Sequence, residues 1–500
     1  MHHVKLLDCT LRDGAYLVEK NIGAVAIRGI TEGLVSAGID IIEIGFLQDE
    51  GFGEGKTIYK NACEAEQYIP DDKKESFFAV LADYSRYSVD NLEAYTGKSF
   101  DTVRACFFKK ERKDVLRFCR EIKKKGYRLF VQPVDIMGYS DRELLELIED
   151  VNLIEPYCFS IVDTFGSMYI DDLLRVYSIV HHNLISECKI GFHSHNNLQM
   201  SNALSQEFIK TSYGQREVVI DATVSGMGRG AGNTPTELIA QYLVTKMGYN
   251  YDMDMILDVI DQYMPNIQRK CTWGYSTPYF IAGSYGAHVN NIAFLKQKNS
   301  INSRDIRFIL NSLRSEERKR YDYDLLERIY TDYMNSDIDD DKDMEALCDI
   351  FKGRNVVVIA PGASAGNAQL INEYIQRNNA VTVFINYLFP NIECDFLYLN
   401  NVKRYQTIKN STKYKKTKKI FTSNIVYEKD EGYVIRFSRL IKCGWEHMDN
   451  SAIMLLRLLD NFPVRSIGIA GLDGYETGCE NYISEDMEHV LDMSAQKINL

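Results

Sequence analysis

The sequence lacks the features of several protein classes. Its 11 cysteines form no C-x-x-C pair, so we expect free, mostly buried thiols and no structural zinc site. No apolar run approaches the ~20 residues that span a bilayer, and the N-terminus has no charged segment followed by an apolar stretch. Lys and Arg total 58 against 70 for Asp and Glu, a deficit that argues against nucleic-acid binding. We therefore expect a cytoplasmic chain with no membrane span.

The chain has ample material for folded domains. It has 500 residues, 45% of them hydrophobic, which favours two or three domains. Apolar runs rich in Val, Ile and Phe recur through the first half, each followed by a segment of helical period, and this alternation is typical of a parallel α/β sheet. The eight runs are 4–10, 39–46, 77–83, 102–108, 128–135, 158–165, 189–196 and 217–226.

The number of repeats identifies the architecture. Eight units within about 230 residues match a (β/α)8 TIM barrel, whose usual size is ~250 residues, better than a doubly wound sheet, which generally has fewer strands. We therefore expect an α/β protein with a TIM barrel over residues 1–248 and a helical appendage over 249–335.

A second, smaller domain is expected after an acidic segment. The stretch NSDIDDDKD is too acidic and too poor in large apolar groups to pack, so we expect a linker over 336–351. Residues 352–500 then read as a small Rossmann-like α/β domain that opens with a strand, PGASAGN and a helix. Its strand candidates are 355–360, 380–386, 395–400, 418–423, 433–437 and 464–470.

Polar residues gather at the carboxyl ends of the barrel strands, where the loops of a TIM barrel form the active site. A polar strand end alone can simply approach solvent, but these converge on one rim. They are Asp13, Glu43, Gln132, Asp135, Asp163, His193 and His195.

Two histidines in this set predict a metal site. Side chains alternate along a strand, so His193 and His195 project to the same side. A lone histidine is more often structural, but two at this spacing with an Asp from the first loop favour a metal. The mixed nitrogen and oxygen donors suit Mn²⁺, Mg²⁺, Co²⁺ or Zn²⁺.

Two loops complete the motif set. Arg12 stands beside Asp13, so the carboxylate can hold the guanidinium while the guanidinium neutralises an anionic substrate oxygen. An adjacent pair of this kind is ordinarily a surface ion pair, but Gly14 permits a tight turn and the pair faces the histidines. The loop GMGRGAGN, 226–233, lets backbone N–H groups approach an anion, although glycines also serve crowded turns.

Together, LLDCTLRDG, GFHSHNN and GMGRGAGNTPTE resemble the metal-dependent aldolase and lyase superfamily with an Asp-Arg-Glu barrel site, which includes hydroxymethylglutaryl-CoA lyase and isopropylmalate synthase. Within it, the motifs and AGSYGAHVNN are most similar to 4-hydroxy-2-oxovalerate aldolase. The resemblance covers about residues 4–300. It implies a pyruvate-type enolate, a divalent metal with Mn²⁺ foremost, and a 2-oxo acid and an aldehyde as small-molecule partners.

The resemblance also implies roles for individual residues. Asp13, His193 and His195 would coordinate the metal, with Asn233 as a further ligand or close neighbour. Arg12 would steady the enolate oxygen, and Glu43 and Tyr285 would belong to the catalytic set. Asp163 and Thr164 match a strand end that is expected to be structural support.

One position departs from the family pattern. Tyr16 stands where the aldolases carry a histidine that is proposed as a base. A phenol has a pKa near ~10 and is a poor base at neutral pH. Tyr16 is therefore expected to act as an acid or to line the pocket, which leaves the substrate and the direction of reaction open.

Two alternative functions remain. A Claisen-type acyltransferase would use acetyl-CoA and a 2-oxo acid in place of an aldehyde, and a non-catalytic scaffold would have lost activity with the Tyr16 change. In the second domain, Gly362 and Gly366 do not complete a dinucleotide fingerprint. A nucleotide or nucleotide sugar remains a candidate partner there, with the lysine-rich stretch 409–419 either contacting phosphate or forming a solvated loop.

Overall fold

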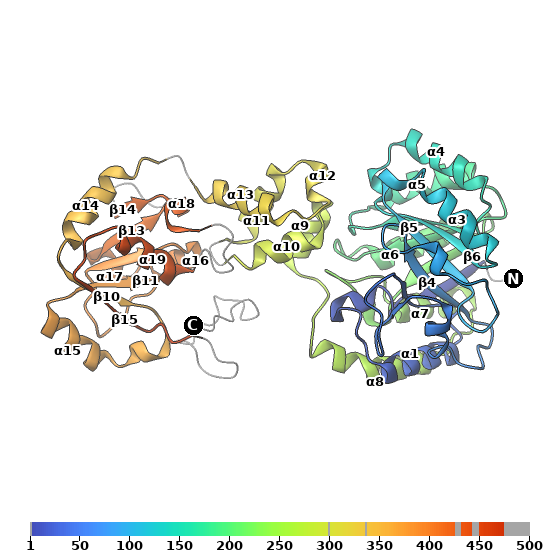
Figure 1. Ribbon diagram of the computed structural model, residues 1–500, viewed down its shortest axis with the longest axis horizontal. Helices are drawn as coiled ribbons and strands as arrows, with labels where there is room; N and C mark the ends of the chain where they lie inside the picture. The colour runs from blue at the N-terminus through green and yellow to red at the C-terminus, as the bar shows by residue number, and fades with distance from the viewer. Residues whose placement is uncertain (1–2, 299–300, 336–337, 426–431, 443–449, 475–500) are drawn as a thin grey trace. The chain divides into compact units, whose positions relative to one another are not determined.

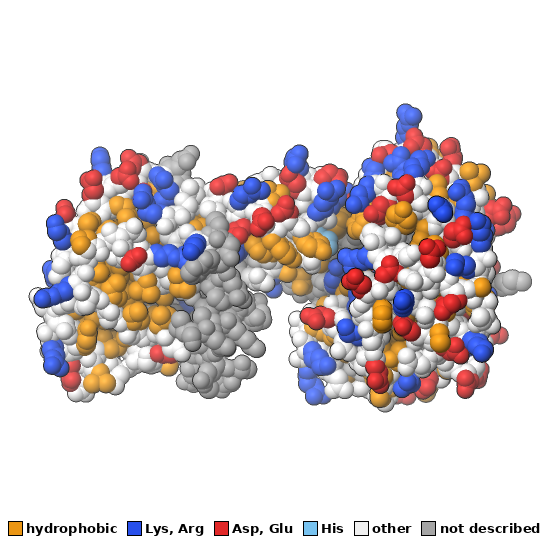
Figure 2. All heavy atoms as spheres, in the orientation of Figure 1, with side chains coloured by type: hydrophobic (Ala, Val, Ile, Leu, Met, Phe, Trp, Pro, Cys, Tyr) orange, Lys and Arg blue, Asp and Glu red, His pale blue; other side chains and the backbone are white. Residues whose placement is uncertain are grey.

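The computed structural model describes residues 3–298, 301–335, 338–425, 432–442 and 450–474. The chain divides into two compact units, Met1–Val289 and Asn290–Leu500 (Figure 1). Within these described ranges, no helix is long and apolar enough to cross a membrane. On the face drawn in Figure 2, acidic and basic side chains are interspersed over the first unit.

The first unit is a closed barrel of eight parallel strands. Strand β1 pairs with both β2 and β9, which closes the sheet, and all eight predicted runs are confirmed as strands. Several predicted runs extend into the loops that follow. The strands are β1 (Val4–Asp8), β2 (Ile41–Leu47), β4 (Phe77–Asp83), β5 (Thr102–Phe107), β6 (Arg128–Pro133), β7 (Cys158–Asp163), β8 (Lys189–Ser194) and β9 (Val218–Ala222).

Helices cover the outside of the barrel (Figure 1). In α4, Ser140 and Glu143 form a reciprocal capping box, and Leu144, Leu147 and Val151 recur on its buried side at helical spacing. The helices of this unit are α1 (Ala24–Ser36), α2 (Ala62–Glu66), α3 (Val115–Lys124), α4 (Asp141–Asn152), α5 (Ile170–Asn183), α6 (Ser201–Ser212), α7 (Thr236–Met247), α8 (Met253–Gln268) and α9 (Thr277–Ser284).

The barrel interior changes from apolar to charged along the strands. Leu7, Ile41, Phe130 and Val219 belong to one buried apolar cluster. Two residues beyond Ile41 and Val219 in their strands lie Glu43 and Asp221, both buried. Because alternate residues of a strand face the same side, the charged layer lies next to the apolar layer, towards the carboxyl ends.

Strand β2 contains an irregularity beside this charged layer. Its register against β4 shifts between Glu43 and Phe46. Gly45 lies there with φ +151°, and a Cβ at this position would stand 2.3 Å from the Thr57 carbonyl oxygen. The short strand β3 (Ile58–Tyr59), which was not predicted, pairs with β2 just beyond this point. A glycine is therefore required where the β3 segment approaches β2.

The second unit contains a six-stranded parallel sheet, and all six predicted strands are confirmed. The order β14-β13-β12-β11-β10-β15 fits a small α/β domain. Val357 and Ile359 pack in a cluster with Ile371, while Phe351 contacts Phe396, so the sheet has helices on both sides. The strands are β10 (Asn355–Ile359), β11 (Val381–Ile385), β12 (Phe396–Leu399), β13 (Lys418–Thr422), β14 (Gly432–Ile435) and β15 (Ser466–Ala470).

Helices make up much of the remaining described chain. The predicted appendage, 249–335, contains α8 to α13, and the division between the two units falls within it. The helices from Val289 onwards are α10 (Val289–Lys296), α11 (Ser303–Ser312), α12 (Ser315–Arg318), α13 (Tyr323–Met334), α14 (Asp341–Phe351), α15 (Ala368–Asn378), α16 (Val402–Ile408), α17 (Thr412–Lys416), α18 (Phe437–Leu440) and α19 (Ser451–Asp460).

The acidic segment 336–351 differs from the predicted linker. Residues 336–337 lie outside the described ranges, but α14 occupies Asp341–Phe351 and buries Leu347 and Phe351. Asp340 is fully buried, and Arg439 donates to its carboxylate at 2.7 Å. In the sequence, the run of acidic residues hid the apolar positions of the helix that follows it. The carboxylate of Asp340 is neutralised by Arg439, which is distant in the sequence.

Candidate active site at the carboxyl rim of the barrel

The loop after β1 and the end of β8 bring a carboxylate and two imidazoles together. Asp13 Oδ2 lies 3.0 Å from His193 Nε2 and 3.8 Å from His195 Nε2. One ligand atom from each of these three residues lies within 4.8 Å of the others. The predicted same-side projection of the histidines is thus seen, with their rings edge to face and 5.1 Å apart. Such a group can hold a metal ion.

The donor set fits a divalent cation. The Oδ1 atoms of Asp13 and Asn233 are buried and accept no hydrogen bond from a described residue. Buried acceptors without a donor are costly, and a bound cation satisfies an oxygen of this kind. Asn233 is held beside His195 by a backbone bridge, and its Nδ2 donates to the Met227 carbonyl at 3.1 Å. The structure therefore brings Asn233 to the predicted metal group.

Protonation differs between the two histidines. Burial lowers the pKa of His195 to about 3, and the neighbouring His193 and Arg229 add to this lowering, so the ring is neutral at pH 7. Burial also acts to lower the pKa of His193, but hydrogen bonds with Asp13 and Asp221 raise it overall. The pKa of Asp13 is held well below its usual range by Arg12, against the effect of burial. His195 is thus in the form that binds a metal.

Arg12 is anchored by two carboxylates. Its Nε donates to Glu43 Oε2 and its Nη1 donates to Asp13 Oδ2, both at 2.7 Å, and all three side chains are buried. The predicted Arg12–Asp13 pair is therefore an interior ion pair, and Glu43 is the group that orients Arg12.

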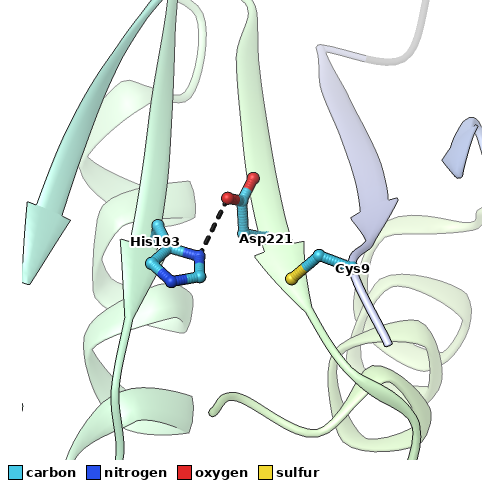
Figure 3. A group of neighbouring side chains, drawn as sticks. All are labelled: Cys9, His193 and Asp221. Atoms are coloured by element: carbon cyan, nitrogen blue, oxygen red, sulfur yellow. Dashed lines mark hydrogen bonds and ion pairs between the residues drawn. The ribbon is translucent and has the colours of Figure 1, made fainter. Parts of the chain in front are cut away.

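Two further charged residues of the site were not predicted. Arg104 on β5 is fully buried; its Nη1 donates to Glu43 Oε2 at 2.9 Å and its Nη2 donates to Asp221 Oδ2. Asp221 in turn accepts from His193 Nδ1 at 2.9 Å (Figure 3). This bond fixes the ring and leaves Nε2 directed at Asp13. Both residues could have been found in the sequence as charged residues inside apolar runs, Arg104 in TVRACF and Asp221 in VVIDA.

Cys9, His193 and Asp221 form a second group with metal-ligand spacing (Figure 3). Burial raises the pKa of the Cys9 thiol well above its usual value, and the thiol donates to the Ala222 carbonyl at 3.3 Å. Metal binding requires the thiolate, and Asp221 is already paired with Arg104. This group supports His193 rather than holding a metal of its own.

Tyr16 lies at the rim beside aromatic and cationic groups. Its ring packs edge to face on Phe46 at 5.0 Å, and the Arg229 guanidinium lies 4.1 Å from the ring centroid. Burial raises the pKa of Tyr16 to about 12, although Arg229 and Arg12 oppose this shift. The hydroxyl is therefore protonated at neutral pH, which agrees with the view that a tyrosine here is a poor base.

The remaining predicted residues lie around the same rim. Asp163 accepts from the backbone N–H of Ser167 at 2.9 Å, as expected of structural support, and Thr164 Oγ1 accepts from the Asp135 N–H at 2.8 Å. Tyr285 follows α9 and is half-buried. Its neighbour His288 lines a small cavity with His195, but a role for Tyr285 in the site stays a prediction.

The lysine-rich stretch of the second unit is folded into its own domain. Lys413 Nζ donates to the Ile392 carbonyl at 2.6 Å, and Lys419 Nζ lies 4.5 Å from the Tyr414 ring centroid. Lys418 begins β13, so the stretch lies at the amino edge of the sheet. Ligands of open α/β sheets bind at the opposite edge, so this position does not favour a phosphate contact.

The fold and the site together define the class of this protein. It is a TIM barrel with a candidate metal centre at its carboxyl rim, built from a carboxylate, two imidazoles and an anchored arginine. Residues 3–262 match the HMGL-like family, and the chain belongs to this family. This membership confirms the resemblance noted in the sequence.

Named relatives and a solved structure agree with this assignment. The chain is 28% identical over 334 residues to a 4-hydroxy-2-oxovalerate aldolase of Pseudoalteromonas translucida, covering 62% of this chain and 91% of the relative. It is also 28% identical over 335 residues to the protein of that name from Carboxydothermus hydrogenoformans, covering 62% and 93%. The crystal structure of the N-terminal domain of a Bacteroides vulgatus protein, proposed to be an aldolase, shares the fold. Its TM-score is 0.52 at 23% identity, covering 58% of this chain and 95% of that domain.

Proposed function

We propose that this chain is a divalent-metal-dependent aldolase that forms or cleaves a carbon–carbon bond of a 4-hydroxy-2-oxo acid through a pyruvate-type enolate. The observation that carries the proposal is the buried group Asp13, His193 and His195 beside the anchored guanidinium of Arg12. The aldolase relatives within the HMGL-like family support it.

Asp13, His193 and His195 would hold the metal, with Asn233 as a further oxygen donor. Two nitrogens and carboxylate or amide oxygens suit Mn²⁺ foremost, with Mg²⁺, Co²⁺ and Zn²⁺ as alternatives. When bound, the cation would act as a Lewis acid towards the carboxylate and carbonyl oxygens of a 2-oxo acid.

Arg12 would stabilise the negative charge of the enolate. A guanidinium has five N–H groups, and the contacts with Glu43 and Asp13 use two of them, so three remain for substrate oxygens. Glu43 and Asp13 fix the plane of the guanidinium before substrate arrives. A preorganised donor of this kind stabilises charge that develops during the reaction without further rearrangement.

The reaction needs no additional reactant. A proton leaves C3 of pyruvate for solvent, and the resulting carbon nucleophile forms a bond with the aldehyde carbon as the π bond of the aldehyde breaks. The aldehyde oxygen takes up a proton to become the 4-hydroxyl, and the group that supplies this proton recovers one from solvent. Tyr16, protonated and at the rim, would donate to this oxygen, and Tyr285 would line the same side of the pocket. Cleavage is the reverse of these steps.

Exchange of the C3 protons of pyruvate in D2O, followed by proton NMR, tests the proposal. The protein is stripped of metal and refilled with Mn²⁺ or, for sharper lines, Mg²⁺. We expect metal-dependent exchange that Asp13→Asn abolishes and that Asp258→Asn, at an exposed position on α8, leaves unchanged. Exchange that is absent with every metal, or that survives Asp13→Asn, would refute the assignment and turn attention to acetyl-CoA condensation or a non-catalytic role.

For the second unit we propose a nucleotide or nucleotide sugar as ligand, at the carboxyl edge of its sheet. The supporting observation is the reversal of strand order beside β10, where the loops after β10 and β15 meet. Ser364 N–H donates to Asp473 Oδ2 at 2.8 Å across these loops. Ligands of open α/β sheets bind at such a point. We expect a fluorescent nucleotide to bind the full chain saturably and Ser364→Ala to weaken this binding. Absence of binding would refute the nucleotide proposal.

A cytoplasmic location is proposed from composition alone.

A further inference from the structure

Two cationic side chains lie over the aromatic pair at the barrel rim. The Arg229 guanidinium lies 4.1 Å from the Tyr16 ring centroid. Lys20 Nζ lies 4.2 Å from the Phe46 centroid and 5.4 Å from that of Tyr16. Tyr16 and Phe46 come from different segments, the helical turn Gly14–Val18 and β2, and they touch each other. The rim therefore presents a pair of positive charges on an apolar platform.

No carboxylate of a described residue forms an ion pair with Arg229. Its buried Nε has no hydrogen-bond partner among the described residues. Two acidic groups of this rim are engaged elsewhere, Asp13 with Arg12 and Asp83 with Arg86. An arginine held half-buried without a counter-ion is expected to meet an anion from outside the chain.

Arg229 also borders the candidate metal group. It lines a small cavity with His195, Asn197 and His288. Gly230, the residue after it, has φ +68°, and a Cβ there would meet Asn197 Oδ1 at 2.7 Å, so the glycine-rich loop is held close to the end of β8. Arg229 is thereby fixed between the Tyr16 ring and the cavity beside His195.

Lys20 shares this electropositive environment. Its Nζ donates to the neutral Gln48 Oε1 at 3.1 Å, and no carboxylate of the described chain pairs with it. Burial, together with Arg86 and Arg229, lowers the pKa of Lys20 to about 8, although Asp83 opposes this shift. A bound anion would relieve the repulsion between Lys20 and Arg229.

We propose that Arg229 and Lys20 bind a remote anionic group, a carboxylate or a phosphate, on the aldehyde that adds to pyruvate. This inference rests on the proposed aldolase function and names the class of its second substrate. Arg12 and the metal group serve the carboxylate and carbonyl of pyruvate, so Arg229 and Lys20, which lie over the Tyr16 and Phe46 rings, are left for the acceptor. The Tyr16 hydroxyl would then donate to the aldehyde oxygen, as in the proposed aldol step.

Matched aldehydes test the proposal. The wild-type, metal-loaded chain is given pyruvate with succinic semialdehyde or butanal, which differ by a carboxylate, and with glyceraldehyde 3-phosphate or glyceraldehyde, which differ by a phosphate. Loss of pyruvate gives kcat/KM for each aldehyde. The variants are Arg229→Gln, Arg229→Lys and Lys20→Gln, and the control is Arg117→Gln, at an exposed position on α3.

The readout is the ratio of kcat/KM for the charged and the uncharged member of each pair. Both members are measured on one preparation, so partial unfolding of a variant changes both values and not their ratio. We expect a wild-type ratio well above one in at least one pair, and a fall of about 10- to 100-fold in Arg229→Gln, the usual effect of losing a charged hydrogen bond. Arg229→Lys keeps part of the ratio, Lys20→Gln causes a smaller fall, and Arg117→Gln has no effect. The pair with the high ratio identifies the anion as carboxylate or phosphate.

A wild-type ratio near one in both pairs, or a ratio that Arg229→Gln leaves unchanged, would overturn the inference while pyruvate exchange still supports the aldolase. Absence of pyruvate exchange in the wild type would instead refute the aldolase function, and the acceptor site with it.

Discussion

Replacing Arg104 by Met should strongly destabilise the barrel. Arg104 is fully buried and pairs with Glu43 and Asp221, so its loss leaves Asp221 without its arginine partner and Glu43 with Arg12 alone. Removing one partner from a buried ion pair costs about 3–5 kcal/mol, because the remaining charge is desolvated and uncompensated. For a domain of this size, about 2–4 °C per kcal/mol gives a fall in melting temperature of about 6–20 °C.

A double-mutant cycle separates lost charge pairing from lost packing. In Arg104→Met with Asp221→Asn, one of the stranded carboxylates is removed as well, so the double variant should be less destabilised than the sum of the single variants by about 1–3 kcal/mol. Stability is measured by urea unfolding and by calorimetry of the barrel transition. Arg117→Met, at an exposed position on α3, is the control and should change stability by less than about 0.5 kcal/mol.

The pH dependence gives an independent check with a fixed sign. Arg104 lowers the pKa of Asp221 against the effect of burial, so without Arg104 the pKa of this carboxyl rises in the folded protein. The folded state of the variant then binds more protons, so its deficit relative to wild type should grow as pH rises from about 5 to about 8. A loss below about 1 kcal/mol at the higher pH, or additive single effects, would show that the charged layer is not held together as described.

Three further predictions concern the site. Asp221→Asn should weaken metal binding about 10- to 100-fold, measured by calorimetry on the stripped protein, because Asp221 orients His193; unchanged affinity would contradict this role. Gly228→Ala should reduce pyruvate exchange and metal affinity, because a Cβ would stand 2.3 Å from Asn233 Nδ2, whereas Gly53→Ala meets only the flexible Lys56 side chain. Lys20 should react with an amine reagent with a midpoint near its pKa of about 8, followed by peptide mass spectrometry, and Arg229→Gln should move this midpoint upwards. A midpoint near ~10, the usual lysine value, would show that Lys20 is not in the electropositive environment described.

The fold was largely predictable because both sheets are parallel and buried. Apolar runs such as VVVI and VTVFI are unmistakable when helical segments separate them, so all eight barrel strands and all six strands of the second unit were found. The two-residue strand β3 was missed because Ile58–Tyr59 is too short to show any periodicity. The helix over Asp341–Phe351 was missed because its acidic exposed side dominates the composition, while only Leu347 and Phe351 are buried.

The candidate site was predictable where sequence neighbours act together. Arg12 with Asp13, and His193 with His195, are close in the chain, so local geometry indicates their meeting. Arg104 and Asp221 are 117 positions apart, and nothing in the order of residues shows that a ladder of strands brings them into one layer. The unpaired state of Arg229 is equally invisible in the sequence, because it depends on which carboxylates are already engaged.

The charges of the barrel divide into two sets with opposite requirements. The interior set links three carboxylates, Asp13, Glu43 and Asp221, to only two guanidiniums, Arg12 and Arg104. Within this set, Asp13 and Asp221 raise the pKa of His193 against the effect of burial. A divalent cation bound beside His193 would offset the surplus of negative charge. The rim set, Arg229 and Lys20, has positive charge and no ion pair with a carboxylate in the part of the chain that the structure describes. An interior that requires a cation and a rim that requires an anion together favour an acceptor whose charge lies away from the carbon that reacts.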